Sequence, residues 1–398
     1  MNRGIRIGRT VCAAVAAAIL AGATVPAGAQ NTPVTFDVIL PMTGQAAFSG
    51  QAEGQSLTAF EKYINANGGL RGAPIHFDIK DDQTSPQVAL QLTNAASARH
   101  VPVIFGSAVV ATCASIGAAV AASGPVQFCF SPGYSPAKDS FSFATGTTIT
   151  ALTRTLLMYA KLRGFHRAAF IGSTDATGIA SAAVNAELFK SPELKGLELV
   201  ADERVGTGDV SAAAQLAKIK AARPDVLWTS TSGTVFATVI HGLADVGLEI
   251  PVLTTTANAS APQLKQLGAL LPRELYFNGV PYQLGDSLKD PELRKQAKMF
   301  ADAFKGIGVE PSALNALSWD PLLIVMAAYR QFGPTMTAEQ LKTFTLGQRH
   351  FAGLNGFYNF GVGDQHGLDS NAVLIIGWNR DKGDFYPASQ LGGVPLKR

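Results

Sequence analysis

The sequence from residue 34 to residue 86 reads VTFDVILPMTGQAAFSGQAEGQSLTAFEKYINANGGLRGAPIHFDIKDDQTSP. Val34–Leu40 is an apolar run of strand length, and Ile75–Ile79 alternates apolar with polar residues. Between them, residues 52–66 have the apolar spacing of a helix, and Asn67-Gly68-Gly69 is typical of a helix end. This stretch therefore predicts two strands joined by a helix, the unit from which α/β folds are built.

The same alternation of short apolar runs and helical patterns continues to residue 331. Ser85-Pro86 predicts the start of the next helix, because serine caps helices well and proline suits the first helical position. Such alternation predicts parallel sheets with helices on both faces. Among these helices, one is expected to be capped by Asp209, and a long one is expected over residues 312–331. Residues 351–379 carry turn glycines between short apolar runs, and they predict hairpins.

Two series of strands and helices lie on either side of residue 150, and no low-complexity linker separates them. A chain of 398 residues exceeds what one core usually serves, since domains comprise roughly 100–200 residues. Hydrophobic residues make up 47%, and charged residues make up 15%, below the usual value of about 25%. The sequence therefore predicts two packed lobes joined by ordinary strands.

The N-terminus has the features of a secretory signal peptide. Arg3, Arg6 and Arg9 form a charged leader, an apolar run follows from Val11 to Leu20, and Ala27-Gly28-Ala29 is a cleavage motif. The apolar run is shorter than the about 20 residues that span a bilayer. We expect residues 1–29 to be removed after Ala29 and the mature protein to reside in the periplasm.

The charge of the chain depends on this leader. The chain contains 32 Lys+Arg and 29 Asp+Glu, and residues 1–29 hold three arginines and no acid, so 29 residues of each sign remain after cleavage. A nucleic-acid binder needs a basic surface on its folded part. The composition predicts none, and no nucleic-acid partner is expected.

Two cysteines, Cys113 and Cys129, lie beyond the leader. In an oxidising compartment such a pair is usually bridged. Cys113 is expected at a helix start and Cys129 at the end of the next strand, so neighbouring elements would bring them together. We predict a disulfide; two buried thiols are the alternative.

At this point the chain resembles the type I periplasmic binding proteins, in the branch that binds leucine, isoleucine and valine or related amides and aromatic acids. The resemblance covers nearly the whole mature chain, and the order and spacing of its short motifs carry it. The motifs are LPMTGQ at 40–45 followed by Gly50, NANGGLRG at 65–72, DDQTSP at 81–86, SPG at 131–133 and SWD at 318–320.

The resemblance implies two doubly wound lobes joined by three crossovers, with the ligand in a cleft at the carboxyl ends of the strands. The first lobe would comprise residues 34–147 and 282–349, and the second residues 148–281 and 350–398. The resemblance also implies a monomeric solute-binding protein that needs no cofactor and delivers a small molecule to the permease of an ABC transporter. A sensory ligand-binding module has the same fold and stays open as an alternative.

Loops that follow strands and open helices suit ligand binding, because helix N-termini carry unpaired N–H groups and a partial positive charge. Residues 110–112, 133–135, 173–178 and 231–233 are such stretches, although Ser, Thr and Asp there also serve as ordinary helix caps. Two aromatic residues are also candidates. Phe48 is expected to cover the ligand and Tyr282 to line the cleft at a crossover; packing in the core is the alternative for both. The expected ligand-binding residues are Phe48, Val110, Ala111, Thr112, Gly133, Tyr134, Ser135, Asp175, Thr231, Thr256, Asn258 and Tyr282.

One departure from the family pattern bears on the ligand. The amino-acid binders that the chain resembles place an acid near the loop after Val252-Leu253, where it pairs with the ligand's ammonium group. Here residues 254–258 read TTTAN and contain no acid. A buried ammonium without a partner is costly. Either Asp175 substitutes from a neighbouring loop, or the ligand is a carboxylic acid that lacks an ammonium and is held near residues 111–112 and 135.

Two enzyme motifs occur in contexts that do not fit their chemistry. Gly285-Asp286-Ser287-Leu288 matches a hydrolase signature but lies late in the chain, before an expected helix start. Ser135-Pro136-Ala137-Lys138 has the spacing of a serine–lysine pair, but the proline breaks the helical turn that would align the two side chains. The six histidines show no metal-binding spacing. We expect neither an enzyme nor a metal site, and a secreted hydrolase is the alternative from another class.

Overall fold

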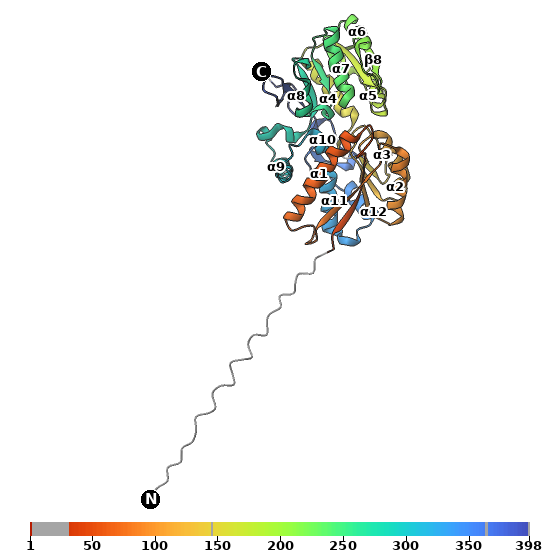
Figure 1. The fold of residues 1–398 in the computed structure, drawn as a ribbon, viewed down its shortest axis with the longest axis vertical. Coiled ribbons are helices and arrows are strands. Elements are labelled where there is room, and N and C mark those ends of the chain that lie inside the picture. The colour runs from red at the N-terminus through yellow and green to blue at the C-terminus, as the bar shows by residue number, and fades with distance from the viewer. Residues whose placement is uncertain (2–31, 145, 363–364, 397–398) are drawn as a thin grey trace.

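The computed structural model describes Met1 and residues 32–144, 146–362 and 365–396. The rest of the predicted signal peptide, including its cleavage site, lies outside the described residues. Two α/β lobes lie one above the other in Figure 1, each built around its own parallel sheet. Among the described helices, none is both long and apolar enough to cross a membrane.

The sheet of lobe one is entirely parallel, with the order β2-β1-β3-β4-β5. Three helices connect its strands. The second of them is capped by Ser85 and begins at Pro86, as expected. The elements are β1 (Val34–Leu40), α1 (Ala47–Ala66), β2 (Ile75–Asp81), α2 (Pro86–Ala98), β3 (Val103–Gly106), α3 (Val110–Val120), β4 (Val126–Cys129) and β5 (Ser142–Ala144).

The sheet of lobe two has the order β16-β15-β11-β10-β9-β7-β8, and only β15 and β16 are antiparallel to their neighbours. Its strands are β7 (Arg167–Ser173), β8 (Glu198–Val205), β9 (Val226–Thr229), β10 (Val252–Thr254), β11 (Leu275–Gly279), β15 (Leu374–Asn379) and β16 (Asp384–Pro387). Its helices are α4 (Ile149–Leu162), α5 (Ala176–Leu188), α6 (Ala213–Ala221), α7 (Gly233–Val246) and α8 (Ala261–Leu267).

The two sheets share one topology. In each, the second strand of the series lies on one side of the first, and the third lies on the other side. The strand order therefore reverses between β1 and β3 in lobe one and between β7 and β9 in lobe two. In open α/β sheets, ligands bind beyond the carboxyl ends of the strands at such switch points.

The chain crosses between the lobes at three places, as expected. It leaves lobe one between β6 (Gly146–Thr147) and α4, and it returns after β11 through the short helix η4 (Pro281–Ser287). It crosses again between β14 (Gly367–Leu368), which pairs with β6, and β15. The helices added to lobe one between the second and third crossings are α9 (Pro291–Lys305), α10 (Ala313–Leu317), α11 (Trp319–Phe332) and α12 (Ala338–Leu346).

The described residues between 351 and 368 pack on lobe one. Their buried side chains Leu354, Tyr358 and Phe360 belong to the core built on β1 and β3, whereas Leu374 and Ile376 belong to the core of lobe two. The expected boundary at residue 350 does not coincide with this change of packing. The carboxyl group of Asp320 on α11 holds the segment, as it accepts hydrogen bonds from the backbone N–H of Leu354 and of Asn355 and from the Tyr358 hydroxyl.

Hairpins occur in the C-terminal region, as expected. β12 (Phe351–Ala352) pairs antiparallel with β13 (Phe357–Tyr358), and β15 pairs antiparallel with β16.

Two expectations about helices are wrong. The helix over 312–331 is broken into α10 and α11 at Ser318, because Pro321 has no N–H to donate to the Leu317 carbonyl and its ring crowds the preceding turn. Asp209 caps no helix; its carboxylate accepts a hydrogen bond from the Gly206 N–H at 2.6 Å and closes a turn ahead of α6.

Candidate ligand-binding site

A cavity of about 120 Å³ lies between the lobes, at the carboxyl ends of both parallel sheets. Its wall in lobe one comes from α1, from the loops after β3 and β4, and from α10. Its wall in lobe two comes from α4, α5, and the loops after β9 and β10. The cavity therefore lies at the two switch points, where the topology predicts a ligand.

The helix that follows the first strand of each parallel sheet contributes a matching pair of polar residues. Ser49 and Glu53 on α1, and Thr177 and Ser181 on α5, are each four residues apart and so lie on one helix face. A glycine lets each helix approach its preceding strand closely. A Cβ at Gly50 would lie 2.3 Å from the Pro41 carbonyl oxygen, and one at Gly178 would lie 2.0 Å from that of Ser173.

Two open helix N-termini face the cavity. Val109 and Ser232 precede α3 and α7, line the cavity, and provide no side-chain hydrogen bond to cap their helices. The first N–H groups of a helix lack intrahelical partners and carry a partial positive charge. Two such termini can hold an anion without a lysine or arginine.

Several buried polar atoms of the cavity wall have no hydrogen-bond partner among the described residues. They are Glu53 Oε2, Trp228 Nε1, Ser230 Oγ and Thr256 Oγ1. A polar group buried without a partner costs free energy, and such groups are rare in folded proteins. Donors and acceptors from both lobes are therefore available to a molecule in the cavity.

Glu53 is the one titratable side chain among the described residues that line the cavity, and no lysine or arginine is among them. It is 1% exposed. Burial raises its pKa well above the usual value, and the neighbouring charge of Asp82 raises it further. Asp82 itself accepts hydrogen bonds from the Ser107 hydroxyl at 2.5 Å and the Thr84 N–H at 2.8 Å.

A buried network supports the lobe-two loop that lines the cavity. The side-chain oxygen of Asn278 accepts a hydrogen bond from the Thr256 N–H at 2.7 Å. The Asn258 amide group donates to the Thr231 carbonyl at 2.7 Å and to the Thr254 hydroxyl at 2.8 Å. Thr231 and Asn258 are fully buried. They hold the loop in place and are not part of the cavity wall.

The predicted disulfide is confirmed: Cys113 and Cys129 are bonded, with their Cα atoms 5.7 Å apart. It ties the first turn of α3 to the end of β4, directly behind the cavity wall. Tyr134 packs against it, and the Tyr134 hydroxyl lies 3.1 Å from the Ser142 hydroxyl. The Gln127 amide group donates to the carbonyls of Gly106 and Cys113 and fixes the same loop.

The structure brings together some of the predicted site residues. Gly133 and Thr256 line the cavity, and residues 110–112 form the first turn of α3, immediately after the lining residue Val109. Within that turn, Val110 is half-buried, Ala111 is exposed, and the buried Thr112 donates its hydroxyl to the Val109 carbonyl.

Others are placed elsewhere. Phe48 is 44% exposed, Ser135 is exposed, and Asp175 is exposed and caps α5 through the Gly178 N–H. The Tyr282 ring packs on Phe300 with centroids 5.2 Å apart, beneath the second crossover.

The predictions missed Glu53, Trp228, Ser230 and Asn278. A signal for Glu53 exists in the sequence, because it lies one helical turn before Leu57 on the face that Leu57, Phe60 and Ile64 define. A carboxyl group on an otherwise apolar helix face points to a function or a buried partner.

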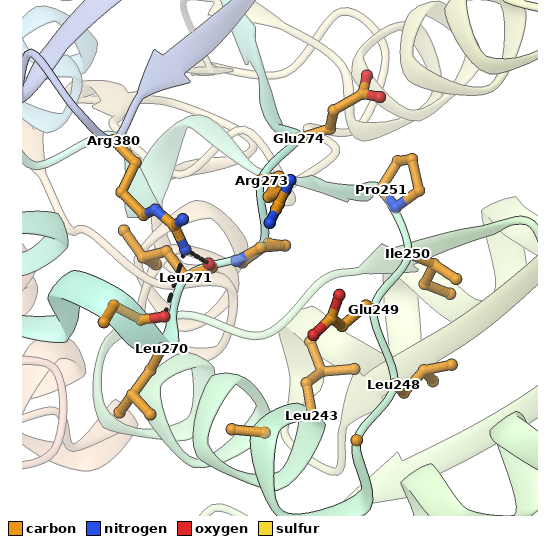
Figure 2. Close-up of a pocket in the computed structure, with 14 residues that line it drawn as sticks. Leu243, Leu248, Glu249, Ile250, Pro251, Leu270, Leu271, Arg273, Glu274 and Arg380 are labelled. Atoms are coloured by element: carbon orange, nitrogen blue, oxygen red, sulfur yellow. Dashed lines mark hydrogen bonds between the residues drawn. The ribbon is translucent and has the colours of Figure 1, made fainter.

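A larger hollow of about 550 Å³ lies at the opposite edge of the lobe-two sheet, before β10 and β11 (Figure 2). Leucines line part of it, and Arg380 reaches across to donate hydrogen bonds to the carbonyls of Ala269 and Leu271. This hollow lies within lobe two alone and at the amino ends of its strands, whereas open α/β sheets bind ligands at the carboxyl ends. The smaller interlobe cavity is therefore the candidate ligand site. Among the described residues, no cluster of three or more His, Cys, Asp or Glu could hold a metal ion.

The chain is similar in sequence to a known family and in structure to several solved proteins. A family model described as periplasmic binding protein matches residues 33–382. No curated protein matches the chain in sequence.

Among solved structures, an extracellular ligand-binding receptor from Rhodopseudomonas palustris HaA2 superposes with a TM-score of 0.78 at 21% identity, covering 90% of this chain and 99% of the receptor. The substrate-binding protein LivJ of a branched-chain amino acid transporter from Streptococcus pneumoniae, solved with isoleucine, gives a TM-score of 0.71 at 20% identity, covering 89% and 97%. A leucine-binding protein from Thermotoga maritima gives 0.71 at 17% identity, with the same coverage.

Proposed function

The chain belongs to the periplasmic binding protein family, and from this premise we propose that it captures a small carboxylate-bearing molecule between its lobes and delivers it to an ABC importer. The observation that carries the proposal is the pair of open helix N-termini, at Val109 and Ser232, that face one cavity whose described lining contains no lysine or arginine. Helix termini suit a carboxylate because their first N–H groups have no partner within the helix and already point toward the space where an anion would lie.

The ligand's carboxylate would lie against the first turn of α3, residues 110–112, and the loop at Gly133. The Trp228 N–H and the Ser230 hydroxyl, which lack partners among the described residues, would donate from lobe two. The apolar part of the ligand would contact Leu152 and the Trp228 ring.

Binding would hold the lobes together. The lobes already touch where α3 meets α5 and where α10 meets the loop after β10. A ligand that contacts both walls binds the closed arrangement more tightly than the open one and so favours closure. Closure would present a surface to the permease, and the ligand would be released unchanged.

The support for a ligand class is of two kinds. The cavity has a volume of about 120 Å³ and is lined from both lobes, which indicates a small ligand. The S. pneumoniae and T. maritima proteins of the same fold bind isoleucine and leucine, as their names state. We therefore propose a branched-chain or related amino acid, or an aliphatic or aromatic acid of similar size, as the ligand.

The proposal includes export, with residues 1–29 removed after Ala29, and a monomer in the periplasm. Intact-mass measurement of periplasmic protein is expected to give a chain beginning at Gln30 and carrying no lipid. A mass that retains residues 1–29 would contradict export with cleavage.

A thermal-shift screen of amino acids, aliphatic and aromatic acids and their amides tests the proposed binding. A ligand at a thousandfold excess over its dissociation constant stabilises the folded state by about 4 kcal/mol, which gives a clear rise in melting temperature. We expect carboxylates to be the stabilising compounds. Stabilisation by amides alone would contradict the proposal.

A further inference from the structure

We propose that Glu53 is the specificity-determining residue of the cavity, and that it selects a ligand with a cationic amino group near its carboxylate. This inference rests on the proposed function and deepens it, because it assigns the second charged group of the ligand. The acid is provided by α1 of lobe one rather than by the loop over residues 254–258 of lobe two.

The first support is the position and isolation of the side chain. Glu53 is 1% exposed, lines the cavity, and has its Oε2 atom buried without a hydrogen-bond partner among the described residues. Among the ion pairs of the described residues, none involves Glu53, and no described lysine or arginine lines the cavity. A buried carboxyl group is normally paired or hydrogen-bonded.

The second support is that the surrounding structure fixes Glu53 in place. On the adjacent turn, the Ser56 hydroxyl donates to the Asn315 carbonyl at 2.7 Å, and the Asn315 amide group donates to the Ala52 carbonyl at 2.5 Å. These bonds tie α1 to α10 on both sides of Glu53. The α1 backbone is therefore fixed on both sides of Glu53, whose side chain is buried at the cavity wall.

The third support is the electrostatic balance of the cavity. Asp82, from the loop after β2, is the charged group that acts on Glu53, and it is also acidic. Burial and the charge of Asp82 both disfavour the ionised form of Glu53, and a ligand anion alone would disfavour it further. A ligand that also carries an ammonium group offsets this charge, donates to Oε2, and lets the helix termini hold its carboxylate.

The test compares amino acids with the same molecules lacking the amino group, on wild-type protein and on Glu53→Gln. The pairs are L-alanine with propionate, L-leucine with 4-methylpentanoate, and L-phenylalanine with 3-phenylpropanoate, each titrated by calorimetry. Glutamine keeps the size of the side chain and removes its charge. Glu339→Gln, on the exposed first turn of α12, is the matched control.

For the pair that binds best, we expect the amino acid to bind wild type about ten- to a hundredfold more tightly than the acid. Glu53→Gln should remove most of that preference, because it should weaken binding of the amino acid and leave binding of the acid unchanged or tighter. Glu339→Gln should change neither affinity. Tighter binding of the acid by wild type, or a preference that survives Glu53→Gln, would overturn the assignment of Glu53 and leave the proposed function standing. Failure of both members of every pair to bind would contradict the proposed function, and the inference with it.

Discussion

The side-chain oxygen of Asn278, at the end of β11, accepts the backbone N–H of Thr256 at 2.7 Å. Both residues line the cavity, and the bond fixes the loop in which the Thr256 hydroxyl has no partner among the described residues. A strand of the sheet thus positions a loop of the cavity wall through a single side chain.

Asn278→Ala is expected to lower the free energy of unfolding by about 1–3 kcal/mol, because it leaves the Thr256 N–H without its acceptor. Chemical denaturation measures this change. Asn371→Ala, in an exposed turn of lobe two, is the control and should have a smaller effect. Equal effects of the two substitutions would show that the bond does not support the loop.

Asp320→Asn is expected to destabilise the protein by at least about 1–3 kcal/mol. The Asp320 carboxyl group accepts from two backbone N–H groups, from the Asn355 amide group and from the Tyr358 hydroxyl, so an NH₂ group would face donors in a buried site. Denaturant unfolding checks the value. Tyr358→Phe removes one donor only and should cost less; an unchanged stability of Asp320→Asn would contradict the role given to the carboxyl group.

Removing the disulfide by Cys113→Ser with Cys129→Ser is expected to lower stability by about 3 kcal/mol, because the bridge closes a loop of 16 residues in the unfolded chain. Urea denaturation of the double variant and of wild type, each with and without reductant, measures the cost. Reductant should shift wild type toward the variant and leave the variant unchanged. Coincident curves for all four samples would contradict the prediction.

The buried Glu53 predicts a pH dependence of stability in the ligand-free protein. Its pKa is raised in the folded state by burial and by Asp82, so the folded chain binds a proton more tightly than the unfolded chain does. The contribution of Glu53 to the free energy of unfolding is greatest below the unfolded-state pKa of about 4.3, and it declines as pH rises toward the folded-state pKa. Glu53→Gln removes this decline, so the stability of the variant should rise relative to wild type with increasing pH. Parallel pH profiles of the two proteins would show that Glu53 titrates normally.

Much of the fold follows from local sequence patterns. The run at 34–40 predicts a buried strand, and the structure places β1 there, because a strand covered on both faces is mostly apolar; its Asp37 pairs with Arg99. Ser85-Pro86 marks its helix start correctly because capping is a local interaction. The break at Ser318 has a local signal in Pro321, but the residues on either side continue the apolar pattern of one helix and favour an unbroken one.

The site is harder to predict because long-range packing creates it. Glu53 is buried because α10 covers α1, and the bonds between Asn315 and residues 52 and 56 join segments about 260 residues apart in sequence. Tyr134 and Thr231 lie in loops next to the cavity, as expected, but their side chains turn to the disulfide and to the Thr229 hydroxyl. A sequence pattern identifies the strand-end loops and does not show which side chain of each loop faces the ligand.

The most direct test of the central claim is a calorimetric comparison of the best-stabilising carboxylate with its own primary amide. The two differ by the charge that the N-termini of α3 and α7 are proposed to hold, and little in size. We predict that the amide binds about ten- to a hundredfold more weakly, the cost of losing a charge-assisted hydrogen bond of roughly 1.5–3 kcal/mol. An amide that binds as tightly as the acid would contradict the account of the cavity as a carboxylate site.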